Sequence, residues 1–99
     1  IKRNAWDAAA TGASGVSNTI RMSGFPIVAV FGSVNGETTL TLEVAIDGDV
    51  AAPDWFATQI QLFLPIGDFH RTFLLGVPFL RLRSSANVTA SVTVMGTTG

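Results

Sequence analysis

The stretch Leu40-Thr41-Leu42-Glu43-Val44-Ala45-Ile46 decides the fold, because its even-numbered side chains are all large and apolar. Successive side chains of a β-strand point to opposite faces of the sheet, so this period of two predicts a strand with one buried face. The segments 80–83 and 88–94 repeat the alternation. No stretch of the chain has a convincing helical period, so the sequence predicts an all-β protein.

Strand-like segments follow one another at the close spacing typical of a β-sandwich. The strongest turn signal is Asn35-Gly36, which favours a tight hairpin between the strands on either side. We therefore expect one antiparallel β-sandwich, of jelly-roll or immunoglobulin-like type, with about seven strands. The expected strands lie near 17–23, 26–34, 37–46, 55–64, 68–75, 78–84 and 87–95.

Residues 1–16 differ in composition from the rest, being rich in Ala, Gly and Ser. Such a segment predicts an extended N-terminal arm, which leaves 17–99 as the sandwich domain. Trp6 is the large anchor of the arm, and it either packs back on its own domain or docks on a neighbouring molecule. On this interpretation, removing residues 1–12 leaves the sandwich folded.

Composition limits the partners of the chain. At 99 residues it forms one domain, and 47% of the residues are hydrophobic while only 13% are charged. A net charge of −1 argues against an electrostatic grip on nucleic acid. No run approaches the roughly 18 apolar residues needed to span a bilayer. The absence of cysteine excludes disulfides and thiolate metal sites.

Three segments, 27–31, 62–64 and 73–75, are apolar on both faces. In a small antiparallel sandwich such strands indicate that an outer face is covered, which predicts a homo-oligomer. The alternative is local coverage by the N-terminal arm. The candidate interface residues are Trp6, Ile27, Ala29, Phe31, Phe63, Phe73, Arg81 and Arg83.

Arg81 and Arg83 have the same strand parity and form a basic stripe on the polar face of their strand. They either pair across the sheet with Glu43 or Glu37, or bind carboxylates of a partner, which guanidinium groups match bidentately.

Catalytic residues are not evident. His70 and Asp68 share a face of a predicted strand, but a triad also needs an exposed nucleophile. Ser84-Ser85 lacks the Gly-x-Ser-x-Gly context of a nucleophile elbow. We expect neither an enzyme nor a bound cofactor.

A loop between two predicted strands carries three carboxylates, Asp47, Asp49 and Asp54, just before Trp55. Clustered oxygens suit calcium, although Asp-Gly is also ordinary turn chemistry. Trp55 is either a core residue or a platform on which a sugar stacks.

Two segments resemble small β-sandwich virion proteins of tailed bacteriophages. They are FGSVNGETTLTLEVAIDG, residues 31–48, and FLRLRSSANVTASVTV, residues 79–94. The resemblance implies a capsid decoration (cement) protein, which sits as a trimer on the major capsid protein at the capsid surface and has no catalytic residues. The chain departs from the family pattern at 50–54, which precede Trp55.

The expected function is therefore that of a structural virion protein, made in the host cytoplasm, which stabilises a phage shell. The alternative is a carbohydrate-binding or host-surface-binding module of a phage tail or fibre, with Trp55 as the glycan contact. A glycan module is expected to remain monomeric or to work as one domain of a larger chain, and to lose binding when Trp55 is replaced by alanine.

Overall fold

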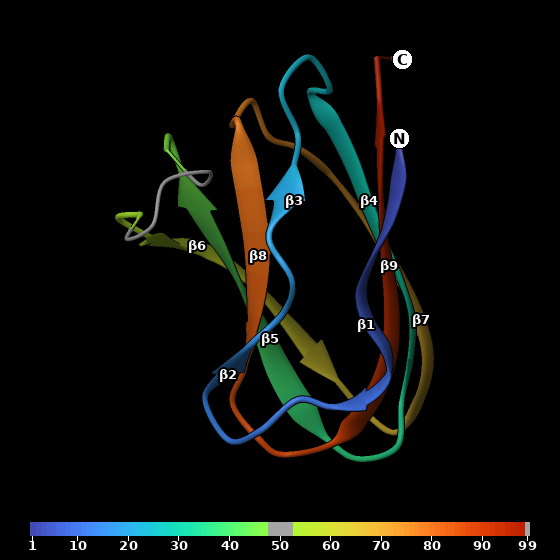
Figure 1. Ribbon diagram of the computed structural model, residues 1–99. Coiled ribbons are helices and arrows are strands. Elements are labelled where there is room, and N and C mark those ends of the chain that lie inside the picture. Colours follow the sequence, from blue (N-terminus) through green and yellow to red (C-terminus); the bar gives the residue numbers. More distant parts are fainter. Residues whose placement is uncertain (48–52, 99) are drawn as a thin grey trace.

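The computed structural model describes residues 1–47 and 53–98, which form nine strands and no helix (Figure 1). Accordingly, no helix in these ranges is long enough to cross a membrane. All strand pairs are antiparallel. The strands are β1 (Lys2–Ala10), β2 (Gly15–Val16), β3 (Ile20–Arg21), β4 (Ile27–Val34), β5 (Thr38–Ala45), β6 (Phe56–Leu64), β7 (Gly67–Leu74), β8 (Phe79–Ser84) and β9 (Thr89–Thr97).

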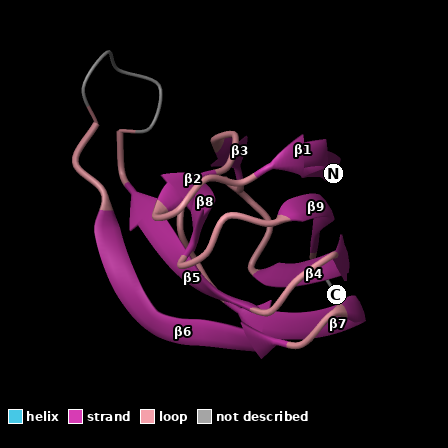
Figure 2. Cartoon of the chain, turned by 90° about the horizontal axis from the view of Figure 1, so that it is seen from below, coloured by secondary structure: helices cyan, strands magenta, loops and turns pink. Residues whose placement is uncertain are grey.

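The strands form two sheets packed face to face. Sheet A has the order β1-β9-β4-β7, and sheet B has the order β2-β8-β5-β6, with β3 pairing on β8 as well. Among the described strands, β5 and β6 are the consecutive strands that pair with each other. Strands β2 and β3 are also consecutive in sheet B, but both pair with β8. Figure 2 shows the chain passing from β6 in sheet B to β7 in sheet A at one side of the molecule. The predicted all-β sandwich is confirmed.

The core lies between the sheets and consists of the side chains that the alternation predicts. Leu40 and Leu42 of β5, Leu80 and Leu82 of β8, and the alternate valines of β4 and β9 are almost fully buried. Ile46 was expected to face inward as well, and this expectation is wrong. It lies beyond the end of β5 and is 72% exposed, because the chain has left the sheet at that point.

The hairpin predicted at Asn35-Gly36 does not form. The turn connects β4 to β5, which belong to different sheets, and neither turn residue has the positive φ of a type I′ turn. Asn35 instead binds the start of β9: its Oδ1 accepts from the amide of Thr89 at 2.8 Å, and its amide donates to the carbonyl of Thr89 at 3.1 Å. The predicted turn is therefore a connection between the two sheets and not a hairpin within one sheet.

The structure does not confirm the extended arm expected for residues 1–16. Residues 2–10 form β1, an edge strand of sheet A that pairs with β9 from Lys2 opposite Met95 to Ala10 opposite Thr89. Trp6 lies opposite Val92 and is only 6% exposed. The radius of gyration is 12.4 Å, close to the roughly 12.6 Å of a compact domain of this length. The described strands exceed the expected seven because β1 was missed and 17–23 contains the separate β3, with β2 just before it.

Candidate functional site

The outer face of sheet A carries an apolar patch. Val28 and Val30 of β4 face the core, so Ile27, Ala29 and Phe31 face outward. Leu74 of β7 is paired with Ile27 and is 81% exposed. Met95 of β9 is paired with Ala29. We call these residues, Ile27, Ala29, Phe31, Leu74 and Met95, the sheet-A patch.

Polar residues surround the sheet-A patch without placing a charge at its centre. Ala29 lies opposite Thr72 on one side, and Phe31 lies between His70 and Thr93. The Phe31 and His70 rings meet edge to face, with centroids 6.3 Å apart. The outer face of β4 is therefore an apolar strip bordered by hydroxyl groups and one imidazole.

The residues predicted as an interface divide among three places. Ile27, Ala29 and Phe31 lie together in the sheet-A patch, as described above. Trp6 is buried in the core, and the side chain of Phe73 packs against the core from edge strand β7. The remaining three lie on the outer face of sheet B, as their pairing with β5 requires. They are Phe63, Arg81 and Arg83. A single flat contact surface cannot contain them all.

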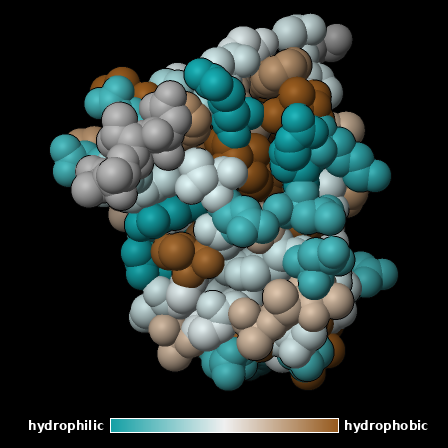
Figure 3. Space-filling model, in the orientation of Figure 1, coloured by the Kyte–Doolittle hydropathy of each residue, from teal (hydrophilic) through white to brown (hydrophobic). Residues whose placement is uncertain are grey.

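Large exposed apolar side chains occur on several elements. Figure 3 shows one side of the molecule, where apolar groups appear as separate areas between polar ones. They therefore do not form one continuous surface there. The exposed large apolar residues are Val16, Ile46, Phe56, Phe63, Ile66 and Leu74.

An ionic cluster occupies the middle of the outer face of sheet B. Glu43 of β5 lies opposite Arg81 of β8, and Arg83 is two residues further along the same strand. The Nε atoms of Arg81 and Arg83 each lie 2.7 Å from a carboxylate oxygen of Glu43. Arg83 also donates from Nη1 to the carbonyl of Ser14 at 2.6 Å. Both arginines thus pair within the sheet, which was the alternative to a clamp on a partner.

Trp55 lies over this cluster. The guanidinium carbon of Arg81 is 4.3 Å from the centre of the Trp55 ring, a cation–π contact. Trp55 is partly exposed, so it is not a core residue. One face of its ring is occupied by Arg81, which leaves less of the ring for stacking on a sugar.

The pKa of Glu43 reflects its position between the two arginines. Burial by itself raises the pKa, but hydrogen bonds from Arg83 and Arg81, together with their positive charges, outweigh it. The pKa therefore lies below the ordinary value of 4.5. Because the folded state lowers this pKa, the carboxylate stabilises the fold above pH 4.5, and this contribution is lost as the pH falls through the folded pKa.

We expect Glu43→Gln to destabilise the domain by about 1–3 kcal/mol at neutral pH, because it removes charge-assisted hydrogen bonds to two guanidinium groups. Urea unfolding at several pH values measures the effect. The difference from wild type should shrink well below pH 4.5, where Glu43 itself becomes neutral. Glu37→Gln, at an exposed carboxylate, is the matched control. A difference that does not depend on pH contradicts this role of the charge.

The residues considered for catalysis are not brought together. His70 is in β7 of sheet A, and its Nε2 lies 3.3 Å from the hydroxyl of Thr72. Ser84 is in β8 of sheet B, fully buried, with its hydroxyl 2.6 Å from that of Thr38. The serine and the histidine thus belong to different sheets, and no nucleophile–base pair forms between them.

The acidic loop is only partly described. Asp47 and Asp54 are exposed, whereas Asp49 lies outside the described residues. In residues 1–47 and 53–98, no three His, Asp or Glu side chains are grouped so that they could hold a metal ion.

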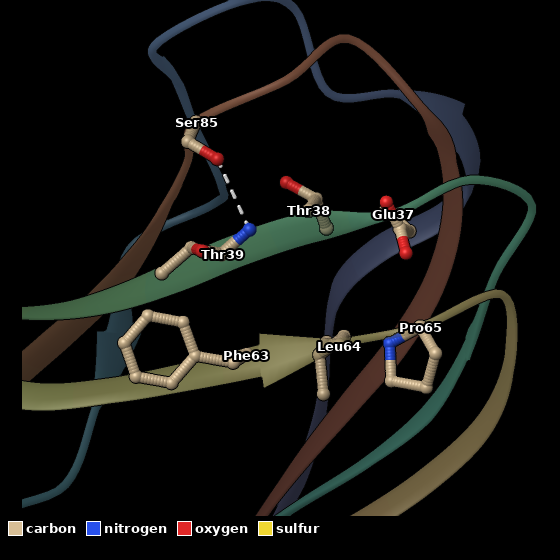
Figure 4. Close-up of a pocket in the computed structure, with 7 residues that line it drawn as sticks. All are labelled: Glu37, Thr38, Thr39, Phe63, Leu64, Pro65 and Ser85. Carbon is tan, nitrogen blue, oxygen red and sulfur yellow. Dashed lines mark hydrogen bonds between the residues drawn. The ribbon is translucent and has the colours of Figure 1, made fainter.

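A hollow of about 480 Å³ opens at the end of sheet B, where β5, β6 and the end of β8 meet (Figure 4). The sequence suggested other roles for Phe63, Glu37 and Ser85 and did not place them together, because their proximity depends on the strand order β8-β5-β6. The residues that line the hollow are Glu37, Thr38, Thr39, Phe63, Leu64, Pro65 and Ser85.

Comparison with known proteins gives no relative from which a function can be transferred. No protein-family model, no curated protein and no solved structure matches the chain.

Proposed function

We propose that this protein is a structural virion protein, a decoration or cement protein that stabilises a phage capsid by burying apolar surface. In this role it forms a homo-oligomer, which we expect to be a trimer, and contacts the major capsid protein at the capsid surface. The mechanism is contact rather than chemistry. The support comes from the strand order and from the sheet-A patch.

The strand order supports the proposal by analogy. If β2 and β3 count as one interrupted strand, the sheets have the orders β1-β9-β4-β7 and β2/β3-β8-β5-β6. We infer a jelly roll, in which eight strands fold as two Greek keys, and this fold occurs in viral capsid proteins, lectins and cupins. A fold alone does not determine function, so the contact surface must carry the argument.

The single observation that carries the proposal is the sheet-A patch. The outer face of a free antiparallel sheet is usually polar, since water covers it. Here Leu74 is 81% exposed beside the half-buried Ile27, and the strip continues along β4 through Ala29, which is 8% exposed, to the half-buried Phe31. Such a face is stabilised when a second molecule covers it.

The free energy that burial contributes determines how large the contact must be. Burial contributes about 25 cal/mol per Å² of apolar surface, and association costs offset much of it. Stable interfaces bury about 800 Å² per partner. The sheet-A patch forms the centre of such a contact, and the hydroxyl groups of Thr72 and Thr93 fit its polar rim.

Light scattering across a dilution series tests the proposal. The wild type should persist at about three times the 10.4 kDa mass of the chain. We expect Leu74→Glu to give monomers, because a charge would be buried in the contact. Phe63→Glu is the matched control, since Phe63 is 71% exposed on the opposite face, and it should remain a trimer. A wild type that is monomeric throughout contradicts the proposed assembly.

A further inference from the structure

We propose that the hollow at the end of sheet B binds one ring of a neutral sugar. This inference does not depend on the proposed role in the shell, because the hollow lies on the sheet opposite the sheet-A patch. It also differs from the sugar site expected at Trp55, which lies over Arg81.

Three residues of the outer face of sheet B form one row in the hollow. Thr39 of β5 lies opposite Phe63 of β6 on one side and beside Ser85, which follows β8, on the other. The amide of Ser85 donates to the carbonyl of Thr39 at 3.0 Å, and the Ser85 hydroxyl accepts from the amide of Thr39 at 3.0 Å. These two hydrogen bonds hold Ser85 beside Thr39, and Figure 4 shows the one between the Thr39 amide and the Ser85 hydroxyl.

The backbone of Thr38 and Leu64 forms the floor of the hollow, and the side chains of both residues point into the core. Leu64 is 3% exposed, and Thr38 is 6% exposed with its hydroxyl 2.6 Å from that of Ser84. The Thr38 hydroxyl also lies 3.3 Å from the amide of Ala86, which donates to it. Because these polar groups already have partners, the floor is fixed before a ligand arrives, which reduces the ordering cost of binding.

Phe63 supplies the apolar contact. Its side chain is 71% exposed although its backbone is held in the β5–β6 ladder. Sugar rings have one face of C–H groups, whose hydrogens carry a partial positive charge. The negatively charged face of an aromatic ring attracts such groups, and the contact also buries apolar surface. Pro65 also lines the hollow, and Figure 4 shows Leu64 between it and the Phe63 ring.

The polar groups around Phe63 suit hydroxyl ligands. The carboxylate of Glu37 is exposed and can accept two hydrogen bonds from vicinal hydroxyls. The hydroxyl of Ser85 accepts from Thr39 and keeps its own proton to donate. Thr39 adds a hydroxyl that can donate or accept. Both kinds of hydrogen bond that a sugar hydroxyl makes are therefore provided.

The charge of the hollow selects against anions. Glu37 is the charged residue among the seven that line it, so an acidic ligand would be repelled. The volume of about 480 Å³ falls within the roughly 300–1,000 Å³ of small-molecule sites. Because the site is open to solvent, we expect the dissociation constant of a single ring to lie in the millimolar range.

NMR titration of the full chain with methyl glycosides of glucose, galactose, mannose and N-acetylglucosamine tests the inference. At least one should give saturable shifts of the amides of Thr39, Phe63 and Ser85. Phe63→Ala should weaken binding by about tenfold, since the stacking surface is lost. Trp55→Phe is the matched control at the other aromatic residue and should leave the affinity unchanged.

Charge provides a second arm of the test. Methyl glucuronide, which carries a carboxylate, should bind wild type more weakly than methyl glucoside does, and Glu37→Gln should remove this difference. The spectra themselves report whether each variant is folded. The inference is overturned if none of the four glycosides gives saturable shifts, if the shifts lie around Trp55, or if Phe63→Ala binds as well as wild type.

Discussion

Replacing Trp6 with alanine is expected to destabilise the domain by about 3–5 kcal/mol, which is a large part of the stability of a small domain. Trp6 is 6% exposed and belongs to the core, opposite Val92 of β9. Alanine leaves a cavity that the paired strands around it cannot close without breaking the β1–β9 ladder. Urea unfolding followed by far-UV circular dichroism measures the loss.

Phe56→Ala is the matched control, since this aromatic side chain is 59% exposed and its loss should cost less than about 1 kcal/mol. Removing residues 1–10 should act more strongly than Trp6→Ala, because it also uncovers the edge of β9. If the truncated chain unfolds at the same urea concentration as wild type, β1 does not contribute to the core. The expectation from sequence, that residues 1–12 are dispensable for folding, would then hold.

The sequence predicted those strands in which alternation is strong. In β5, β8 and β9, apolar side chains mostly alternate with Thr, Ser, Glu or Arg, and each strand begins and ends within two residues of the expected segment. It missed β1, where Ala8-Ala9-Ala10 gives no difference between the two faces. Strand β1 is also irregular, with register shifts around Trp6 and a positive φ of 48° at Ala8.

Alternation predicts which face of a strand is buried, but it does not predict which strands are neighbours. The turn signal at Asn35-Gly36 suggested a hairpin, and the alternation could not show that β4 and β5 lie in different sheets. The hollow depends on the same missing information. Glu37 and Phe63 are far apart in the sequence and line the same hollow only because β5 pairs with β6.

The Glu43 cluster was partly predictable. The parity of Arg81 and Arg83 placed both on one face, and Glu43 had the correct parity to meet them. The sequence left open whether these arginines serve a partner. The structure pairs both with Glu43 at 2.7 Å, so an interface role for Arg81 and Arg83 would first have to break two ion pairs.

Gly32→Ala is expected to have the other large effect, a loss of more than about 4 kcal/mol. Gly32 lies in β4 between β7 and β9 and has a φ of 153°, which side chains rarely adopt. A Cβ there would overlap the carbonyl oxygen of Ser91 and lie 2.9 Å from the Cα of Val92. These are backbone atoms of a paired central strand, so they cannot move aside as a side chain would.

Thermal unfolding measures this effect against a matched glycine. The melting temperature of Gly32→Ala should fall by more than about 15 °C, since 1 kcal/mol corresponds to roughly 4–8 °C in a domain of this size. Gly76→Ala is the control, because a Cβ at Gly76 meets nothing within 4 Å and its φ is not in the left-handed region. It should leave the melting temperature unchanged or slightly higher. Equal melting temperatures for both variants would mean that β4 and β9 do not approach each other at Gly32, and the register that places Phe31 and Met95 in one patch would be wrong.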